Sequence, residues 1–252
     1  MLARLLLLVS AAIASQSALG WDDFGHRLVA RLAYLKLEPA ARSEVDSLLG
    51  GGVEAVIDAS LWANRNKAGR PNTVPWHYVN IPLEADGYDR ARDCPKSNCI
   101  VEKLEEFVEV LKSNSATKQE KREALRFVLH FVADIHQPLR CADRNDRGGT
   151  DVTLVWDKRK TNLREVWDHY VLTNTLSQIM DSTADGTVVD WCNESHEISR
   201  RVAYEGLPGN GASVSQAYIE TARAVATDRL GKGAARLATL LNETFGTVSA
   251  SP

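Results

Sequence analysis

Two side chains in the middle of the sequence have the types and the spacing of metal ligands. His130 and Asp134 lie four residues apart, so on a helix both project from the same face. The apolar residues around them predict a buried helix, and a buried imidazole or carboxylate needs a polar partner. The pair is therefore either a hydrogen-bonded couple in the core or two ligands of one metal ion.

The other histidines differ in their surroundings. His77 lies between two aromatic residues, where it either packs or is held as a fixed ligand. His136 is six residues beyond His130, about 240° around the helix, and a Gln-Pro sequence follows it, so we expect a structural role. His169 and His196 lie in no ligand-like pattern and are expected to be surface or packing residues.

The first twenty residues have the features of a secretory signal peptide. Arg4 precedes an apolar run, and Ala18 and Gly20 place small residues at positions −3 and −1 of a cleavage site. Cleavage would leave one exported domain, residues 21–252, with Trp21 first. The freed α-amino group, with a pKa of about 7.7–8.0, can bind a metal together with its own carbonyl. His26, five residues further on, could join that site or serve as a cap.

The composition sets limits on function. The chain of 252 residues is 44% hydrophobic and 25% charged, which is typical of a globular protein. Its net charge of −3 is unlike that of a protein that holds nucleic acid by excess basic residues alone. If the protein acts on phosphates, a bound metal could supply the missing positive charge. No segment reaches the roughly 18 apolar residues that a membrane span needs, so we expect no membrane insertion.

The hydrophobic periodicity predicts one all-α domain with a small β excursion at 151–156. Helices are predicted at 26–37, 39–50, 54–64, 98–112, 119–136, 161–181, 194–205 and 213–242. Loops that contain proline or glycine are predicted at 69–75, 82–96, 138–150 and 206–212. An even number of cysteines, Cys94, Cys99, Cys141 and Cys192, favours disulfides in an exported chain, with three pairings open.

Several sequence blocks together carry a family resemblance. In order, they are Trp21, Gly25-His26, Trp62-Ala63, Trp76-His77-Tyr78, His130-Phe131-Val132 with Asp134-Ile135-His136-Gln137-Pro138-Leu139, Asp146-Arg147-Gly148-Gly149, and Asn162-Leu163 with Val166-Trp167-Asp168. This set resembles the S1/P1 nucleases, zinc-dependent single-strand nucleases that are similar in fold to bacterial zinc-dependent phospholipase C. The resemblance covers residues 21 to about 240.

The resemblance implies an activity, a metal centre and a disulfide. The family hydrolyses single-stranded DNA and RNA, often removes 3′-phosphates from nucleotides, and uses three zinc ions. Carried over, Trp21 and His26 would bind one zinc ion of a close pair, His77 and His130 the other, and Asp134 would bridge them. Cys94 and Cys99 match the spacing of a family disulfide.

The chain departs from the family pattern at three ligands. Asn64 stands where the family has an aspartate of the close pair, and Arg140 and Arg164 stand where it has two histidines of the third zinc site, which keeps only Asp168. Arginine stays protonated and cannot bind zinc, so about two zinc ions are expected instead of three. Thr150 replaces the family's asparagine beside the substrate phosphate.

Two functional hypotheses follow. In the first, Arg140 and Arg164 replace the third zinc ion as a clamp on the substrate phosphate, with Arg164 pairing with Asp168. The protein is then an exported, monomeric phosphodiesterase, with Asp134 and the two arginines as catalytic residues and Thr150 as a further substrate contact. In the second, it is a metal-depleted, inactive relative that binds phosphate or nucleic acid. Phospholipid hydrolysis is a third reading, which the absence of a basic amphipathic helix disfavours.

Overall fold

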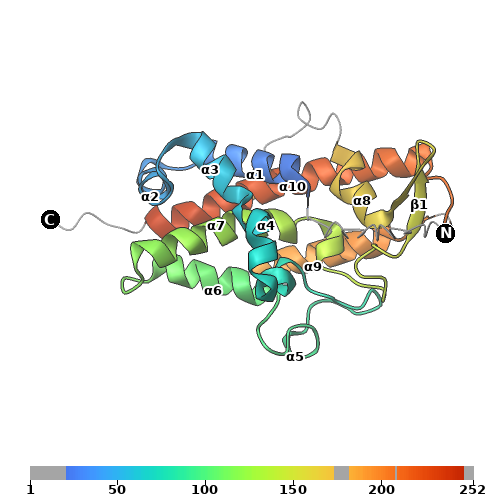
Figure 1. The fold of residues 1–252 in the computed structure, drawn as a ribbon, viewed down its shortest axis with the longest axis horizontal. Coiled ribbons are helices and arrows are strands. Elements are labelled where there is room, and N and C mark those ends of the chain that lie inside the picture. Colours follow the sequence, from blue (N-terminus) through green and yellow to red (C-terminus); the bar gives the residue numbers. More distant parts are fainter. Residues whose placement is uncertain (1–20, 173–181, 208, 247–252) are drawn as a thin grey trace, which may run out of the picture.

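The computed structural model describes residues 21–172, 182–207 and 209–246. Within them the protein is mainly helical, with one two-stranded sheet, as predicted (Figure 1). The longer helices are α1 (Asp23–Leu35), α2 (Pro39–Leu49), α3 (Gly52–Ser60), α6 (Ile100–Lys112), α7 (Lys118–Ile135), α9 (Val188–Ile198) and α10 (Gln216–Gly246). Short helices are α4 (Trp62–Asn66), α5 (Arg90–Asp93) and α8 (Leu163–Asp168). The predicted signal peptide, residues 1–20, lies outside the described residues.

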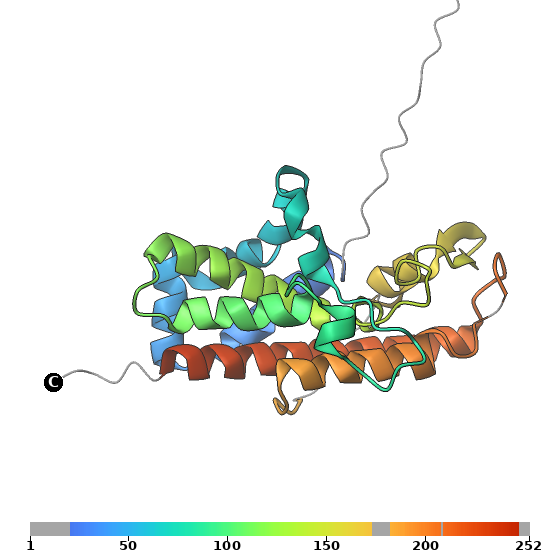
Figure 2. The ribbon, with the colours of Figure 1, turned by 90° about the horizontal axis from the view of Figure 1, so that it is seen from below.

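Helix α10 runs along the length of the molecule (Figures 1 and 2), and α1, α2, α6 and α7 pack against it. Helix α1 packs against α10 and α3, and α6 packs against α7. Strand β1 (Thr153–Trp156) and α8 lie toward the end of the molecule opposite to α2 (Figure 1). No helix of the described segments is long and apolar enough to cross a membrane.

Helix α7 carries His130 and Asp134 in its buried second half. It begins with a capping box, in which Thr117 accepts a hydrogen bond from the Glu120 N–H and the Glu120 carboxylate accepts one from the Thr117 N–H. Its second half is buried on every side, so the two polar side chains lie in the core rather than at the surface. They must therefore find polar partners within the protein.

The predicted β excursion is confirmed as strand β1 (Thr153–Trp156). The expected helix at 161–181 is wrong at Thr161 and Asn162, which belong to a strand, whereas α8 follows directly at Leu163–Asp168. Strand β2 (Arg159–Asn162) pairs with β1 in an antiparallel hairpin. Asp157 and Lys158 form its two-residue turn with positive φ angles of 44° and 64°. A strand needs a partner, and the basic residues of β2 gave no alternating pattern to reveal it. Residues 173–181, the last part of the predicted helix, lie outside the described residues.

Other helix boundaries differ from the predicted ones. The predicted helix at 54–64 is divided at Leu61 into α3 and α4, and a π turn (Ser199–Ala203) extends α9. The predicted loops contain short helical turns, including η2 (Pro71–His77) and η3 (Pro138–Arg140). Cys94 and Cys99 form a disulfide at the start of α6.

Candidate metal centre

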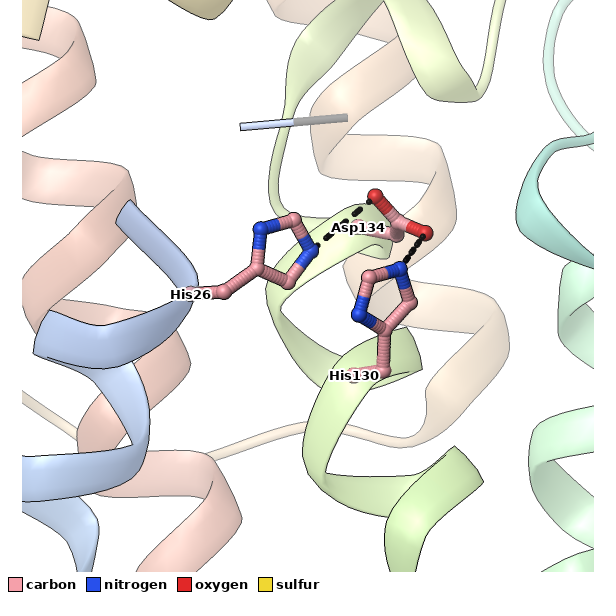
Figure 3. A group of neighbouring side chains, drawn as sticks. All are labelled: His26, His130 and Asp134. Atoms are coloured by element: carbon pink, nitrogen blue, oxygen red, sulfur yellow. Dashed lines mark ion pairs between the residues drawn. The ribbon is translucent and has the colours of Figure 1, made fainter. Parts of the chain in front are cut away.

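Three histidines from three different elements converge on the carboxylate of Asp134. Its Oδ2 atom lies 2.8 Å from His77 Nδ1 and 3.1 Å from His130 Nε2. Its Oδ1 atom lies 3.4 Å from His26 Nε2. Figure 3 shows His26 reaching one carboxylate oxygen from α1 and His130 reaching the other from α7. All four side chains are fully buried.

Backbone carbonyls fix two of these imidazole rings from behind. His26 Nδ1 lies 3.1 Å from the Asp22 carbonyl oxygen, and His130 Nδ1 lies 2.7 Å from that of Ser60. A proton on each Nδ1 leaves the Nε2 lone pairs facing Asp134, which is how metal-binding histidines are commonly oriented. The two rings stack with their centroids 4.0 Å apart. The ring positions are thus set by backbone contacts as well as by the carboxylate.

The start of α1 brings His26 to this place. Asp22 caps the helix by accepting a hydrogen bond from the Gly25 N–H at 3.1 Å. A Cβ atom on residue 25 would lie 2.6 Å from Trp21 Cβ, so only glycine lets Trp21 fold back over the first turn. Trp21 is fully buried, and the next residue donates its N–H to the Asp168 carbonyl oxygen at 3.0 Å. These contacts hold the predicted mature N-terminus beside the histidine cluster.

The donor set fits a metal ion. His26, His130 and Asp134 each offer a ligand atom, and these atoms lie within 4.8 Å of one another. The Nε2 atoms of His26, His77 and His130 and the Oδ1 atom of Asp134 are buried without a well-aligned hydrogen bond. Burial lowers the pKa of His77 to about 3 and that of His130 to about 4, so both rings are neutral at physiological pH and keep a lone pair. Although burial opposes it, neighbouring His130 and Arg140 hold the pKa of Asp134 well below its ordinary value.

Asn64, the predicted substitute ligand on α4, differs from these residues in its chemistry. Both polar atoms of its amide are covered by protein and have no hydrogen-bond partner. Burying a polar amide without hydrogen bonds lowers the stability of the fold unless a bound ligand supplies the missing partner. An amide can offer only a neutral oxygen to a metal, so position 64 brings one negative charge less than a carboxylate would.

A pocket of about 230 Å³ lies next to this cluster and is rich in arginine. Its lining residues are Tyr78, Asn80, Arg140, Asp143, Arg147, Thr150 and Arg164. Arg140 and Arg164 are almost fully buried, and Arg140 Nε lies 3.7 Å from Asp134 Oδ1. The Thr150 hydroxyl donates to the Arg147 carbonyl oxygen at 3.0 Å. The structure therefore brings three of the predicted substrate contacts, Arg140, Arg164 and Thr150, into one pocket.

Arg164 and Asp168, which were expected to pair, form no direct ion pair in the described part of the chain, although the charge of each affects the pKa of the other. Asp168 Oδ1 instead accepts a hydrogen bond of 2.6 Å from Gln137 Nε2. Two nitrogens of Arg164, Nε and Nη1, are buried without a hydrogen-bond partner. Burial, together with the charge of Arg140, lowers the pKa of Arg164 to about 10, so it remains cationic at neutral pH. Arg164 thus has donors left for an anionic ligand.

A third cation of this region is Lys67, which the sequence analysis missed. Its side chain is 8% exposed, and burial followed by repulsion from Arg140 lowers its pKa to about 8. Asp134 and Arg164 also affect this pKa, so Lys67 lies within electrostatic range of both the histidine cluster and the arginine pocket. It follows Asn64 by three residues, and that helical spacing could have identified it.

Comparisons with known proteins agree with this geometry. The S1/P1 Nuclease family model matches residues 21–185 and 172–246. The chain belongs to the S1/P1 nuclease family. Over 266 residues, 90% of the chain and 91% of the relative, it is 28% identical to Endonuclease 2 of Arabidopsis thaliana. It is 27% identical to Nuclease S1 of Aspergillus oryzae, with 95% of the chain and 97% of that protein aligned. Nuclease P1 of Penicillium citrinum is 27% identical over 60% of the chain and 58% of its own length.

Proposed function

We propose that the protein is an exported, zinc-dependent phosphodiesterase that hydrolyses single-stranded DNA or RNA, and 3′-nucleotides as further substrates, as a monomer. The observation that carries this proposal is the convergence of His26, His77 and His130 on the two oxygens of one buried carboxylate, Asp134. A pocket of buried arginines opens next to it. The chain is similar along most of its length to proteins named as nucleases, which supports the same assignment.

Two zinc ions are proposed, fewer than the three that the family uses. Trp21, through its amino nitrogen and carbonyl oxygen after signal-peptide cleavage, His26 and Asp134 would hold one. His77, His130, Asn64 and Asp134 would hold the other. Bound zinc would supply Lewis-acid charge and lower the pKa of water toward neutrality. Asp134 reaches both histidine groups with different oxygens, which suits a bridging role.

The protein's own cations would bind the substrate phosphate. Arg140 and Arg164 stand in place of two zinc-binding histidines of the family, so two guanidinium charges replace the two charges of one zinc ion. Planar guanidinium groups can donate two parallel hydrogen bonds to phosphate oxygens, and a buried site strengthens these bonds. Arg164 has two buried donors without a protein partner, and Lys67 adds a third positive charge nearby. These groups would stabilise the charge that develops on the phosphate oxygens.

A second candidate function is binding without hydrolysis. The observation that favours it is Asn64, whose uncharged amide weakens the metal site that His77 and His130 would form. In that case the arginine pocket would still bind phosphate, and the protein would be a metal-depleted relative of the nucleases. The same three substitutions are thus read either as compensation or as loss of the metal centre.

Zinc content and turnover together separate the two functions. The chain is purified with Trp21 exposed by signal-peptide cleavage, dialysed, and analysed for zinc by mass spectrometry. Hydrolysis of single-stranded and duplex DNA is then measured with and without a chelator. About two zinc ions per chain and chelator-sensitive cleavage of the single strand are expected. Phosphate or DNA binding with no zinc and no turnover would establish the second function instead. Preferential cleavage of phospholipid vesicles would overturn the choice of substrate.

A further inference from the structure

Two buried thiols lie on neighbouring elements outside the metal centre. Cys141 follows η3 directly, and Cys192 lies in the middle of α9. Both side chains are completely buried, and both are free thiols in the structure. Neither belongs to the candidate ligands or to the lining of the arginine pocket.

A shared backbone carbonyl shows how close these two segments are. The Ile135 carbonyl oxygen accepts a hydrogen bond of 2.5 Å from Ser195 Oγ and one of 3.8 Å from Cys141 Sγ. Ser195 lies three residues after Cys192, so both project from the same side of α9. The Cys141 side chain is close enough to Cys192 to raise the pKa of that thiol. Helix α9 packs directly on η3, so this contact is part of an interface between elements and not an accident of a loop.

We propose that Cys141 and Cys192 form a second intramolecular disulfide when the protein folds in an oxidising compartment. Of the three pairings that four cysteines allow, the Cys94–Cys99 bond leaves only this one for a second bridge. The oxidant is a disulfide of a protein oxidoreductase or of oxidised glutathione. Two successive thiol–disulfide exchanges form one Sγ–Sγ bond, release the two thiols of the reduced oxidant, and transfer two electrons to it.

The bond must form before the site is fully packed. Burial and the neighbouring Cys141 raise the pKa of the Cys192 thiol well above its ordinary value, and only the thiolate attacks a disulfide. Once formed, the bond is sealed in the core, where a soluble reductant cannot reach it. It is therefore a structural bond rather than a switch.

The bond would anchor the segment that presents Arg140. Cys141 is the next residue, and the Arg140 backbone is already held by its N–H to the Gln137 carbonyl and by its carbonyl to the Val79 N–H. A covalent link from Cys141 to α9 would add a second attachment at the C-terminal end of η3. It also closes a loop of roughly 50 residues, which restricts the unfolded chain.

Peptide mapping under non-reducing conditions tests the bond directly. The full chain is refolded in a glutathione redox buffer, denatured, alkylated without reduction, digested and analysed by mass spectrometry. The Cys94–Cys99 bond serves as the internal control that oxidation was complete. A linked peptide pair containing Cys141 and Cys192 is expected. Alkylation of both residues, or a link from either one to Cys94 or Cys99, would overturn the proposal.

Thermal unfolding gives a second test that does not depend on activity. In a Cys94→Ala/Cys99→Ala variant, strong reductant during refolding should lower the Tm by roughly 5 °C or more, since only the proposed bond remains to be lost. A variant with all four cysteines changed to alanine should show no effect of reductant. Equal Tm values for the two-cysteine variant with and without reductant would contradict the proposal.

Discussion

Arg140 Nε lies 3.7 Å from Asp134 Oδ1, while Oδ2 of the same carboxylate faces His77 and His130 at 2.8 and 3.1 Å. One carboxylate therefore connects the histidine cluster with the arginine pocket. Arg140 stands in place of a histidine ligand in the family pattern, yet it still contacts this shared residue. A change at Asp134 should consequently alter both metal content and phosphate binding.

Asp134→Asn should abolish this connection while keeping the size of the side chain. We expect zinc content to fall and hydrolysis to drop by roughly a hundredfold or more, because an amide cannot bridge two cations. The measurements are zinc per chain and kcat/KM on single-stranded DNA. The control is Asp151→Asn, a carboxylate that pairs with Arg147 at the surface. Unchanged zinc content in Asp134→Asn would mean that the carboxylate is not a ligand.

Asn64→Asp should strengthen the metal centre. The change restores a negative charge where both atoms of the buried amide have no partner. We expect zinc affinity to rise by roughly tenfold or more in a competition titration with a chromogenic chelator. Asn66→Asp is the matched control on α4, where the amide donates to the Trp62 carbonyl instead. Equal zinc affinity of Asn64→Asp and the wild type would place residue 64 outside the metal site.

Arg140→Ala tests the proposed clamp. Loss of a buried guanidinium from the pocket should lower kcat/KM by roughly 10² to 10³. Arg140→Lys should recover only part of it, because lysine cannot make the two-point contact. Arg147→Ala is the control, since this arginine lines the same pocket but is 73% exposed and pairs with Asp151. Similar losses for Arg140→Ala and Arg147→Ala would show that only the general charge matters.

The sequence predicted the parts of the site that lie on one long helix. His130 and Asp134 keep their spacing because α7 is regular and buried, so the i, i+4 rule was sufficient. The family resemblance added His26, His77 and Asn64, which no local pattern connects. The convergence of α1, η2 and α7 on Asp134 is a tertiary property that periodicity in a single segment cannot contain.

The sequence failed where local and tertiary preferences compete. Asp168 and Arg164 have the spacing of an ion pair on a helix. In the structure, however, the side-chain amide of Gln137 from another segment donates a hydrogen bond to the Asp168 carboxylate. Strand β2 was not predicted, and its last two residues, Thr161 and Asn162, were assigned to a helix, because the strand lacks alternating apolar side chains. Lys67 was missed because a lysine is rarely buried, and only the surrounding elements reveal that it is.

The stability of the protein should fall in acid because of His136. This buried ring accepts a hydrogen bond from Arg236 at 3.1 Å and lies 2.7 Å from the Val132 carbonyl oxygen through Nδ1. Burial and then the charges of Arg229 and Arg236 lower its pKa well below the ordinary value of 6.5. Below about pH 6.5 the unfolded chain therefore binds a proton that the folded one does not, so folding stability decreases as pH falls.

Urea unfolding between pH 5 and 7 measures this effect. One such group contributes a slope of up to about 1.4 kcal/mol per pH unit. His136→Gln keeps a donor and an acceptor but does not titrate, so its stability should depend less steeply on pH than that of the wild type. Parallel pH profiles for the two proteins would show that His136 is protonated in the folded state.

Gly148→Ala should disturb the arginine pocket without replacing a charged residue. Gly148 has a φ of +59°, and a Cβ atom there would lie 2.9 Å from both Arg164 Nη2 and the Leu139 carbonyl oxygen. The new methyl group must displace the guanidinium or the backbone of η3. Gly211→Ala is the matched control, because its φ of +79° carries a similar backbone cost while nothing lies within 4 Å. Gly211→Ala should lose about 1 kcal/mol of folding stability in urea unfolding, and Gly148→Ala should lose more, because the contact with the Leu139 carbonyl oxygen adds to the same backbone cost. Only Gly148→Ala should also raise KM for a single-stranded substrate, and equal KM values for the two variants would show that Arg164 does not contact the phosphate.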